Sequence, residues 1–299
     1  MAESNTRTHK IGLALIVALL MTVSGMMPNA YAASPVSLGK SGNYTLLAQA
    51  TIVTTGATAI TGNVGLSPAN SSALVGFSLS LDPSGSFANS PLVTGKVEAN
   101  NYGDVTQATL LAAISEMRNA FTLAEGRTST VSEGTTALNG QDLPAGVYKW
   151  TGNVAMTGSI TLTGNSSDVW IFQMPGTMTV SNGVAVKLSG GATYNNVFWQ
   201  VLGITTVGKA VNFQGIVLDA SDIFMQTGAT LTGRLLSEMG ISLEANTIAA
   251  PAVATSTTTS SSVPEFPSAA VALIAVVALA AVGFFSKKTL SSPPRARAR

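Results

Sequence analysis

Residues 168–191 read DVWIFQMPGTMTVSNGVAVKLSGG, which is a bulky apolar run, a run alternating Met, Thr and Val, a third short run, and two glycines. Residues 196–215, NVFWQVLGITTVGKAVNFQG, repeat this order, and 216–233 and 235–249 are shorter, less regular copies. Short strands that recur between Gly or Asn turns are typical of a stacked β-solenoid. The sequence therefore predicts a mostly β fold, an irregular three-faced solenoid whose flat faces suit binding better than catalysis.

The parity of the side chains sorts the strands into three classes. One class is apolar at both parities, as in residues 169–172, 197–199 and 216–218. Strands buried on both sides have this pattern, so another element must cover their outer side. We expect the cover to be the chain's one clear amphipathic helix, at about 105–125, lying parallel to the solenoid axis. Its apolar stripe has spacings of three and four residues: Leu110, Ile114, Met117, Phe121 and Ala124.

The ends of this helix carry capping signals. Gly126 is well placed as the C-terminal cap, and Asp104 or Thr106 as the N-terminal cap.

The two other classes alternate, so one side of each faces water. In the first, Met178 and Val180 point inward and their neighbours point outward. The outward positions of this class are the candidate contact residues Thr157, Thr179, Ser181, Thr206 and Ser242, with Phe224 and Glu244 as interruptions. In the second class, the outward positions are Thr161, Thr163, Ala185, Lys187, Asn212, Thr230 and Thr232.

The composition argues against several kinds of function. The chain has 299 residues, 10% of them charged, with a net charge of +1, so it has no electrostatic footprint for nucleic acid. It has no Cys, and its one histidine, His9, lies in a segment that we expect to be removed. We therefore predict no metal, no cofactor and no enzyme activity. Asp219 and Asp222 are the closest carboxylates on the solenoid, and their LDASD context indicates a corner turn.

Both ends of the chain have the features of sorting segments. Residues 1–32 carry basic residues, an apolar run and an Ala-Tyr-Ala site, as a signal peptide does. Residues 268–285 are uncharged and long enough to cross a bilayer, and the basic tail 286–299 is expected in the cytoplasm. Between them we expect one domain at 34–250 and a Ser/Thr/Pro linker at 251–267. The sequence thus predicts an extracellular protein anchored in the cell membrane.

Residues 263–267, VPEFP, precede the apolar segment. Together with that segment and the basic tail they resemble the PEF-type sorting signals of archaeal surface proteins. The resemblance implies a membrane-bound sorting protease as a partner.

Several stretches together resemble the microbial ice-binding protein family. They are Leu38-Gly39, TTGATAITGNVGLSP (54–68), LVTGKV (92–97), AGVYKW (145–150), DVWIFQ (168–173), VKLSGGA (186–192), NVFWQV (196–201) and QTGATLTGR (226–234). The resemblance implies a discontinuous right-handed β-solenoid with one long flanking helix. It also implies that amino-terminal strands and carboxy-terminal coils build one solenoid, capped by the irregular segment 69–102.

The resemblance implies binding to the ice surface through a flat solenoid face. Strong binders in the family show a T-A/G-x-T/N pattern, which 55–58, 58–61 and 227–230 match here; the alternative is a Gly-containing corner turn. Thr suits such a face because its β-branched stem is stiff and carries both a methyl and a hydroxyl group. Because Phe224 and Glu244 interrupt the first class, we expect modest ice activity.

The competing interpretation is a surface adhesin or structural surface protein with this fold and no ice activity. Asn43, Asn70 and Asn165 lie in Asn-x-Ser/Thr sequons, and a glycan on a flat face would oppose ice contact there.

Overall fold

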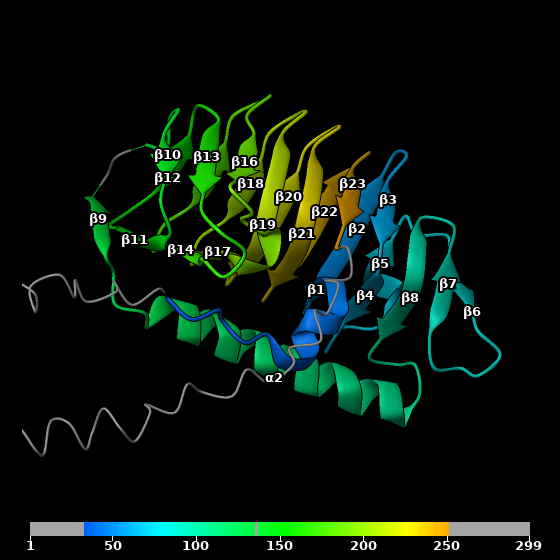
Figure 1. The fold of residues 1–299 in the computed structure, drawn as a ribbon. Coiled ribbons are helices and arrows are strands. Elements are labelled where there is room, and N and C mark those ends of the chain that lie inside the picture. Colours follow the sequence, from blue (N-terminus) through cyan, green and yellow to red (C-terminus); the bar gives the residue numbers. More distant parts are fainter. Residues whose placement is uncertain (1–32, 135–136, 251–299) are drawn as a thin grey trace, which may run out of the picture. The chain divides into compact units, whose positions relative to one another are not determined.

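The computed structural model describes residues 33–134 and 137–250, which belong to one compact unit (Figure 1). The predicted signal peptide, linker, membrane-spanning segment and basic tail lie outside these residues. Within the described part of the chain, no helix is both long and apolar enough to cross a bilayer. The unit is mostly β with one long helix, as the sequence predicts.

The strands of neighbouring coils pair in parallel, and each coil of the chain adds strands to the three faces. Parallel neighbours need crossover connections, which the coils of a solenoid supply. Among the described residues, the antiparallel pairs are those of β6 with β7 and of β7 with β8, at one end of the stack.

The first face is buried on both of its sides. Every residue of β1, β14 and β17 is buried, which matches the doubly apolar class in the sequence. Its strands are β9 (Val131–Gly134), β11 (Gly146–Trp150), β14 (Trp170–Met174), β17 (Val197–Val201), β19 (Asn212–Asp219), β21 (Thr230–Ser237), β1 (Tyr44–Ala48), β4 (Asn63–Leu66) and β8 (Val93–Ala99).

The second face is a seven-stranded sheet with one wet side, and it is called the seven-stranded sheet below. Buried and outward residues alternate along β12, β15 and β20, as the sequence predicts for its first alternating class. The order of its strands is β12 (Val154–Met156), β15 (Met178–Val180), β18 (Thr205–Val207), β20 (Ile223–Met225), β22 (Gly240–Glu244), β2 (Thr51–Thr55) and β5 (Leu74–Val75).

The third face also alternates, and its outward positions are those of the second class in the sequence. It comprises β10 (Asp142–Leu143), β13 (Ile160–Thr163), β16 (Val186–Ser189), the first halves of β19 and β21, β23 (Thr247–Ala249), β3 (Ala59–Thr61) and the start of β8.

Two glycines let β19 and β21 pass from the third face to the first. Gly215 and Gly233 pair across the strands with φ of 119° and 151°, a region that favours glycine. A Cβ atom on Gly233 would lie 1.8 Å from the carbonyl oxygen of Gly215. The corner therefore requires a residue without a side chain.

The amino-terminal strands are inserted into the carboxy-terminal stack. β2 pairs with β22, and β3 pairs with β23, although about 190 residues separate them in the chain. In Figure 1 these blue strands lie between the orange end of the stack and the cyan strands β5 to β8. The irregular segment, with η2 (Ser71–Ala73), β6 (Ser80–Leu81) and β7 (Ala88–Ser90), follows β2 to β4 as a cap. The predicted discontinuous arrangement is confirmed.

The long helix α2 (Asp104–Glu125) covers the first face (Figure 1). Its contacts extend from β8 to β14, so it crosses successive coils along the stack, as predicted. Ile114, Met117 and Phe121 pack against residues of this face such as Phe198 and Leu218. The helix also contacts the short helix η1 (Gly39–Asn43).

The two ends of α2 differ in how well the sequence predicts them. Gly126 is the C-terminal cap and donates its N–H to the carbonyls of Thr122 and Ala124, as expected. The prediction for the other end is wrong, because Gly103 occupies the N-cap position and Asp104 begins the helix. Thr106 is buried instead, and its hydroxyl donates to the carbonyl of Ser86 in the irregular segment that caps the solenoid.

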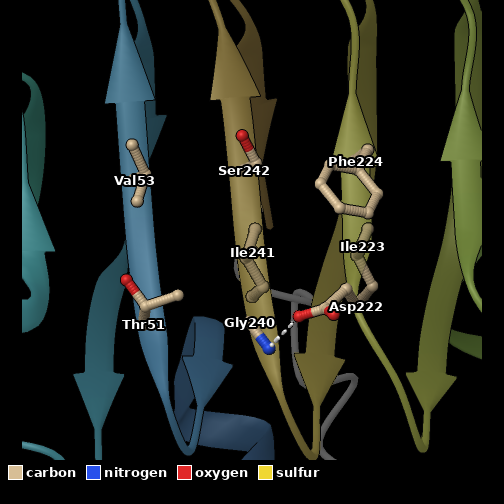
Figure 2. A pocket seen from close by; sticks show the side chains of 8 residues that line it. All are labelled: Thr51, Val53, Asp222, Ile223, Phe224, Gly240, Ile241 and Ser242. Carbon is tan, nitrogen blue, oxygen red and sulfur yellow. Dashed lines mark hydrogen bonds between the residues drawn. The ribbon is translucent and has the colours of Figure 1, made fainter.

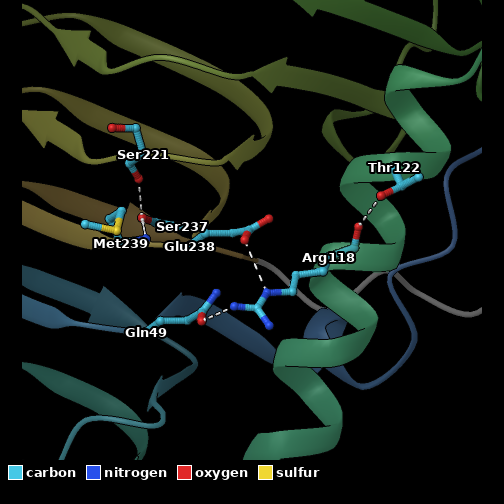
Figure 3. A network of polar contacts seen from close by, with 7 residues as sticks. All are labelled: Gln49, Arg118, Thr122, Ser221, Ser237, Glu238 and Met239. Carbon is cyan, nitrogen blue, oxygen red and sulfur yellow. Dashed lines mark hydrogen bonds and ion pairs between the residues drawn. The ribbon is translucent and has the colours of Figure 1, made fainter.

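Arg118 connects the helix to the site where the amino-terminal strand β1 lies beside the carboxy-terminal strand β21 (Figure 3). Its Nε lies 3.2 Å from Glu238 Oε2, and its Nη2 donates to Gln49 Oε1 at 2.6 Å. Gln49 follows β1 and Glu238 follows β21. The pair is partly exposed, so its contribution is alignment of the helix more than stability.

A buried glutamine on β14 completes the carboxy-terminal end of α2. Gln173 Nε2 donates to the carbonyls of Ala124, Glu125 and Arg127 at 2.8–3.0 Å. The last carbonyls of a helix lack the N–H partner of a following turn, so the Gln173 amide supplies a donor where these carbonyls are removed from water; that of Ala124 also accepts the N–H of Gly126.

We expect Gln173→Leu to destabilise the domain by about 2 kcal/mol, because the buried carbonyls lose their donor. Urea denaturation measures the change. Gln200→Leu is the matched control, since Gln200 is the equivalent buried position on β17, and the structure gives its side chain no bond to the helix carbonyls. Equal losses in both variants would contradict the capping role.

Candidate functional site

The outward side chains of the seven-stranded sheet form a straight central row. The strand registers align Ala155, Thr179, Thr206, Phe224, Ser242, Val53 and Val75 in that order. The residues on either side of each one are almost all buried, so the row stands on a packed base. Neighbouring members are about 4.8 Å apart, the spacing of paired strands.

Two further rows flank the central one, two residues before or after it in each coil, and most of their members directly precede or follow the short strands. One row contains Thr157, Ser181, Gly208, Gln226, Glu244 and Thr55, and the other contains Asn153, Thr177, Ile204, Asp222, Gly240 and Thr51. The five residues that the sequence singles out thus share one face: three lie on the sheet, and Thr157 and Ser181 directly follow β12 and β15. Thr179, Thr206 and Ser242 lie in the central row, and Thr157 and Ser181 lie in the first flanking row.

The sheet divides into two unlike parts. Over β12, β15 and β18 the three rows contain no charged side chain, and we call this area the first patch. Its members are Asn153, Ala155, Thr157, Thr177, Thr179, Ser181, Ile204, Thr206 and Gly208. Beyond β18 the rows contain Phe224, Asp222 and Glu244, which break the uniform surface as the sequence predicts for two of them.

A shallow hollow of about 240 Å³ lies beyond Phe224. Figure 2 shows Phe224 and Asp222 on one side of β22, and Thr51 and Val53 on the other. The hollow forms over β22 because Gly240 has no side chain and that of Ser242 is short. The Phe224 ring, 41% exposed, lines one side of it. Asp222 Oδ1 accepts the N–H of Gly240 at 2.9 Å. The flat part of the sheet therefore ends at β18.

Two of the T-A/G-x-T stretches, 55–58 and 227–230, lie at the corner between the second and third faces, whereas 58–61 continues from that corner into β3 on the third face. Gly56 and Gly228 have φ of 72° and 74°, as a tight corner requires. Thr58 is buried, and its hydroxyl accepts from Thr54 Oγ1 at 2.7 Å. Asn246 closes the next coil by donating to the carbonyls of Gln226 and Ala229. These contacts favour the corner-turn interpretation for 55–58 and 227–230; in the third stretch, Ala59 and Thr61 are exposed residues of β3.

Asp219 is a buried carboxyl group at the end of β19, at the corner where the chain passes from the first face to the seven-stranded sheet. It is 1% exposed, its Oδ2 accepts from Thr205 Oγ1, and its Oδ1 accepts the N–H of Ser221 at 2.7 Å. Burial raises its pKa to about 7, against the lowering effect of these hydrogen bonds. The predicted corner turn is present, but the sequence shows no sign that this carboxyl is buried.

We expect Asp219→Asn to stabilise the domain at pH 8 and to flatten its pH dependence. Because the folded-state pKa is raised from 3.8 to about 7, the wild-type chain loses stability as pH rises through this window. The full cost is of the order of 4 kcal/mol. Thermal unfolding between pH 4 and pH 8 measures it, with Asp222→Asn as control. A slope that persists in Asp219→Asn and disappears in the control would contradict the assignment.

The sequons lie away from the first patch. Asn43 ends η1, Asn70 precedes η2 in the cap, and Asn165 lies in the turn between the third and first faces. All three are exposed. Within the described ranges, no group of three or more His, Asp or Glu side chains is placed to hold a metal ion.

Sequence reasoning missed the outward residues of β2 and β5. Val53 and Val75 extend the central row beyond Ser242, and Thr51 and Thr55 belong to the flanking rows. The alternating TIVTT of residues 51–55 was a usable signal for an exposed strand. The strand that pairs with residues 51–55 could not be predicted from this pattern, because β22 is far away in the chain.

Comparison with known proteins identifies a family with this arrangement. The family model described as ice-binding-like matches residues 46–249. The chain is 37% identical to an ice-binding protein of Flammulina populicola over 74% of this chain and 90% of the relative. It is 39% identical to ice-binding protein K1-A of Typhula ishikariensis over 67% and 84% of the two chains.

Solved structures agree with the sequence comparison. The ice-binding protein LeIBP from an Arctic yeast, studied for its antifreeze activity, superposes with a TM-score of 0.71 and 36% identity. The match covers 73% of this chain and 95% of LeIBP, so a protein of little more than this domain folds by itself. An ice-binding protein from Antarctomyces psychrotrophicus gives a TM-score of 0.62 at 31% identity, over 72% and 98% of the chains. By sequence and by fold, this chain belongs to the ice-binding-like family.

Proposed function

We propose that this chain is a cell-surface ice-binding protein whose first patch contacts the ice crystal. The observation that carries the proposal is the uncharged array of Thr, Ser and Ala in register over β12, β15 and β18. The family relationship supports the same function, since its named relatives are ice-binding proteins.

The proposed mechanism follows from the chemistry of the array. Ice presents no charge pattern, and charged side chains hold liquid water strongly. The Thr methyl and hydroxyl groups sit on stiff β-branched stems over a hydrogen-bonded sheet, so little entropy is lost when they order water. Thr179 and Thr206 supply two such groups on adjacent strands, and Thr157 and Ser181 add hydroxyl groups in the next row.

The outer parts of the chain extend this proposal. A signal peptide at 1–32, a linker at 251–267 and a membrane-spanning segment at 268–285 would hold the domain outside the cell. A sorting protease that recognises residues 263–267 would be a partner. The proposal assigns no catalytic role, cofactor or nucleic acid to the chain.

Ice recrystallisation inhibition by residues 33–250 at micromolar concentration tests the proposal. We expect measurable inhibition, of modest strength, because Phe224 and the hollow limit the flat area. A folded, monomeric sample with no inhibition and no adsorption to ice would overturn the proposal. It would leave the surface adhesin as the better account, which the interruptions at Phe224, Asp222 and Glu244 already favour in part.

A further inference from the structure

The third face carries a second uncharged array, at the opposite end of the stack from the first patch. Two outward rows run across β19, β21, β23, β3 and the start of β8. One row is Asn212, Thr230, Thr247 and Ala59, and the other is Gln214, Thr232, Ala249, Thr61 and Thr94. We call the part from β21 to β8 the third-face patch.

The third-face patch is more regular than the first patch. Thr230 and Thr232 lie side by side on β21, about 6.6 Å apart along the strand, and Thr247 continues the first row on β23. Ala59 and Ala249 alternate with them and keep the surface low. All positions of the third-face patch are Thr or Ala, whereas the first patch also includes Asn153, Ile204 and Gly208.

The base of the third-face patch is rigid. Leu231, Ile248 and Ile60 point inward between the two rows and are at most 2% exposed. Two hydroxyl groups are oriented by the backbone: Thr94 Oγ1 accepts the N–H of Gly62 at 3.0 Å, and Thr230 Oγ1 donates to the carbonyl of Val211. The array therefore keeps its spacing without help from a ligand.

Charged residues mark the edges of the array. Lys187 on β16 follows Gln214 in the second row, and Lys96 lies beyond Thr94 on β8. The area between them offers only methyl groups, hydroxyl groups and the amides of Asn212 and Gln214. This chemistry suits an extended, uncharged, ordered surface of water better than an ion or a charged polymer.

We propose that the third-face patch is a second ice-contact surface, separate from the first patch and on a different face. The inference rests on the proposed function, since it assigns the same ligand to another set of residues. The solenoid presents the two faces in different directions, so each patch meets the crystal in its own orientation of the protein.

The test compares four forms of residues 33–250, each carrying a fluorescent label, on a growing single ice crystal. They are the wild type, a first-patch pair (Thr179→Lys with Thr206→Lys), a third-face pair (Thr232→Lys with Thr61→Lys), and all four substitutions together. The control adds the same charge to exposed positions of α2, as Ala108→Lys with Ser115→Lys. Circular dichroism and thermal unfolding confirm that each form is folded.

We expect each pair to remove labelling of a different set of crystal planes, and the fourfold variant to lower adsorption by about tenfold or more. If the third-face pair labels the same planes as the wild type, and the first-patch pair alone removes all adsorption, the inference is overturned and the proposed function stands. If the wild type does not adsorb to ice, the proposed function fails first. If the third-face pair fails to fold, the single variant Thr247→Arg, at an exposed outward position, decides in the same way.

Discussion

Replacing both Thr179 and Thr206 with lysine is expected to raise the protein concentration needed to inhibit ice recrystallisation by about tenfold or more. The two residues are neighbours in the central row, so the substitutions place two charges in the middle of the first patch. Each ammonium group keeps its own hydration shell and projects above the plane of the sheet. Ordered water can then no longer meet the surface as a continuous layer.

The same variant is expected to fold like the wild type. Both positions point outward, and the buried residues beside them are unchanged, so the stability cost is small. The α2 variant with two added lysines controls for net charge. Undiminished inhibition by the double variant would remove the first patch from the ice-binding surface. Residual inhibition that disappears with the third-face substitutions would assign the remainder to the other face.

Trp199→Ala is expected to have the largest effect on stability, about 3–5 kcal/mol. The ring is fully buried and stacks on Phe172 with centroids 4.1 Å apart and planes within 12°. It also packs against Phe213, and its Nε1 donates to the carbonyl of Gln214 at 2.9 Å. The alanine variant leaves a cavity between two coils and removes the donor to that carbonyl.

Phe224→Ala is the matched control, because it removes an aromatic ring of the same solenoid from an exposed position. Its stability change is expected within about 0.5 kcal/mol. Urea denaturation of both variants gives the comparison. If Trp199→Ala costs no more than Phe224→Ala, the stack of Tyr148, Phe172, Trp199 and Phe213 is not the main support of the coils.

Local patterns predicted the faces because side-chain parity depends only on neighbours in the chain. The alternation in residues 178–181 indicated which residues point outward, and the stripe from Leu110 to Ala124 indicated the helix and the face that it covers. The central row through Thr179 and Thr206 follows from copies of the same repeat. These parts of the fold and of the site needed no knowledge of distant pairings.

Other parts of the site depended on pairings that no local pattern contains. Val53 lies next to Ser242 only because β2 pairs with β22. Thr58 resembles a surface threonine in sequence, and its burial depends on Thr54 and on Asn246 of the neighbouring coil. The N-cap of α2 was misassigned because the Thr106 hydroxyl donates to the carbonyl of Ser86, a residue of the irregular segment that lies 20 residues away in the chain.

The insertion of β1 to β4 beside β21 to β23 has a consequence for how the chain comes to fold. The strands synthesised first find one set of neighbours only in the strands synthesised last, so closure joins the two ends of the domain. Contacts between such distant residues form slowly, because a long loop must close before they contribute. The coils from β11 to β20 pair with coils that are close in the chain and can stack early, while β2 requires β22. We therefore expect the pairing of the amino-terminal strands with β21 to β23 to be a late and slow step of folding.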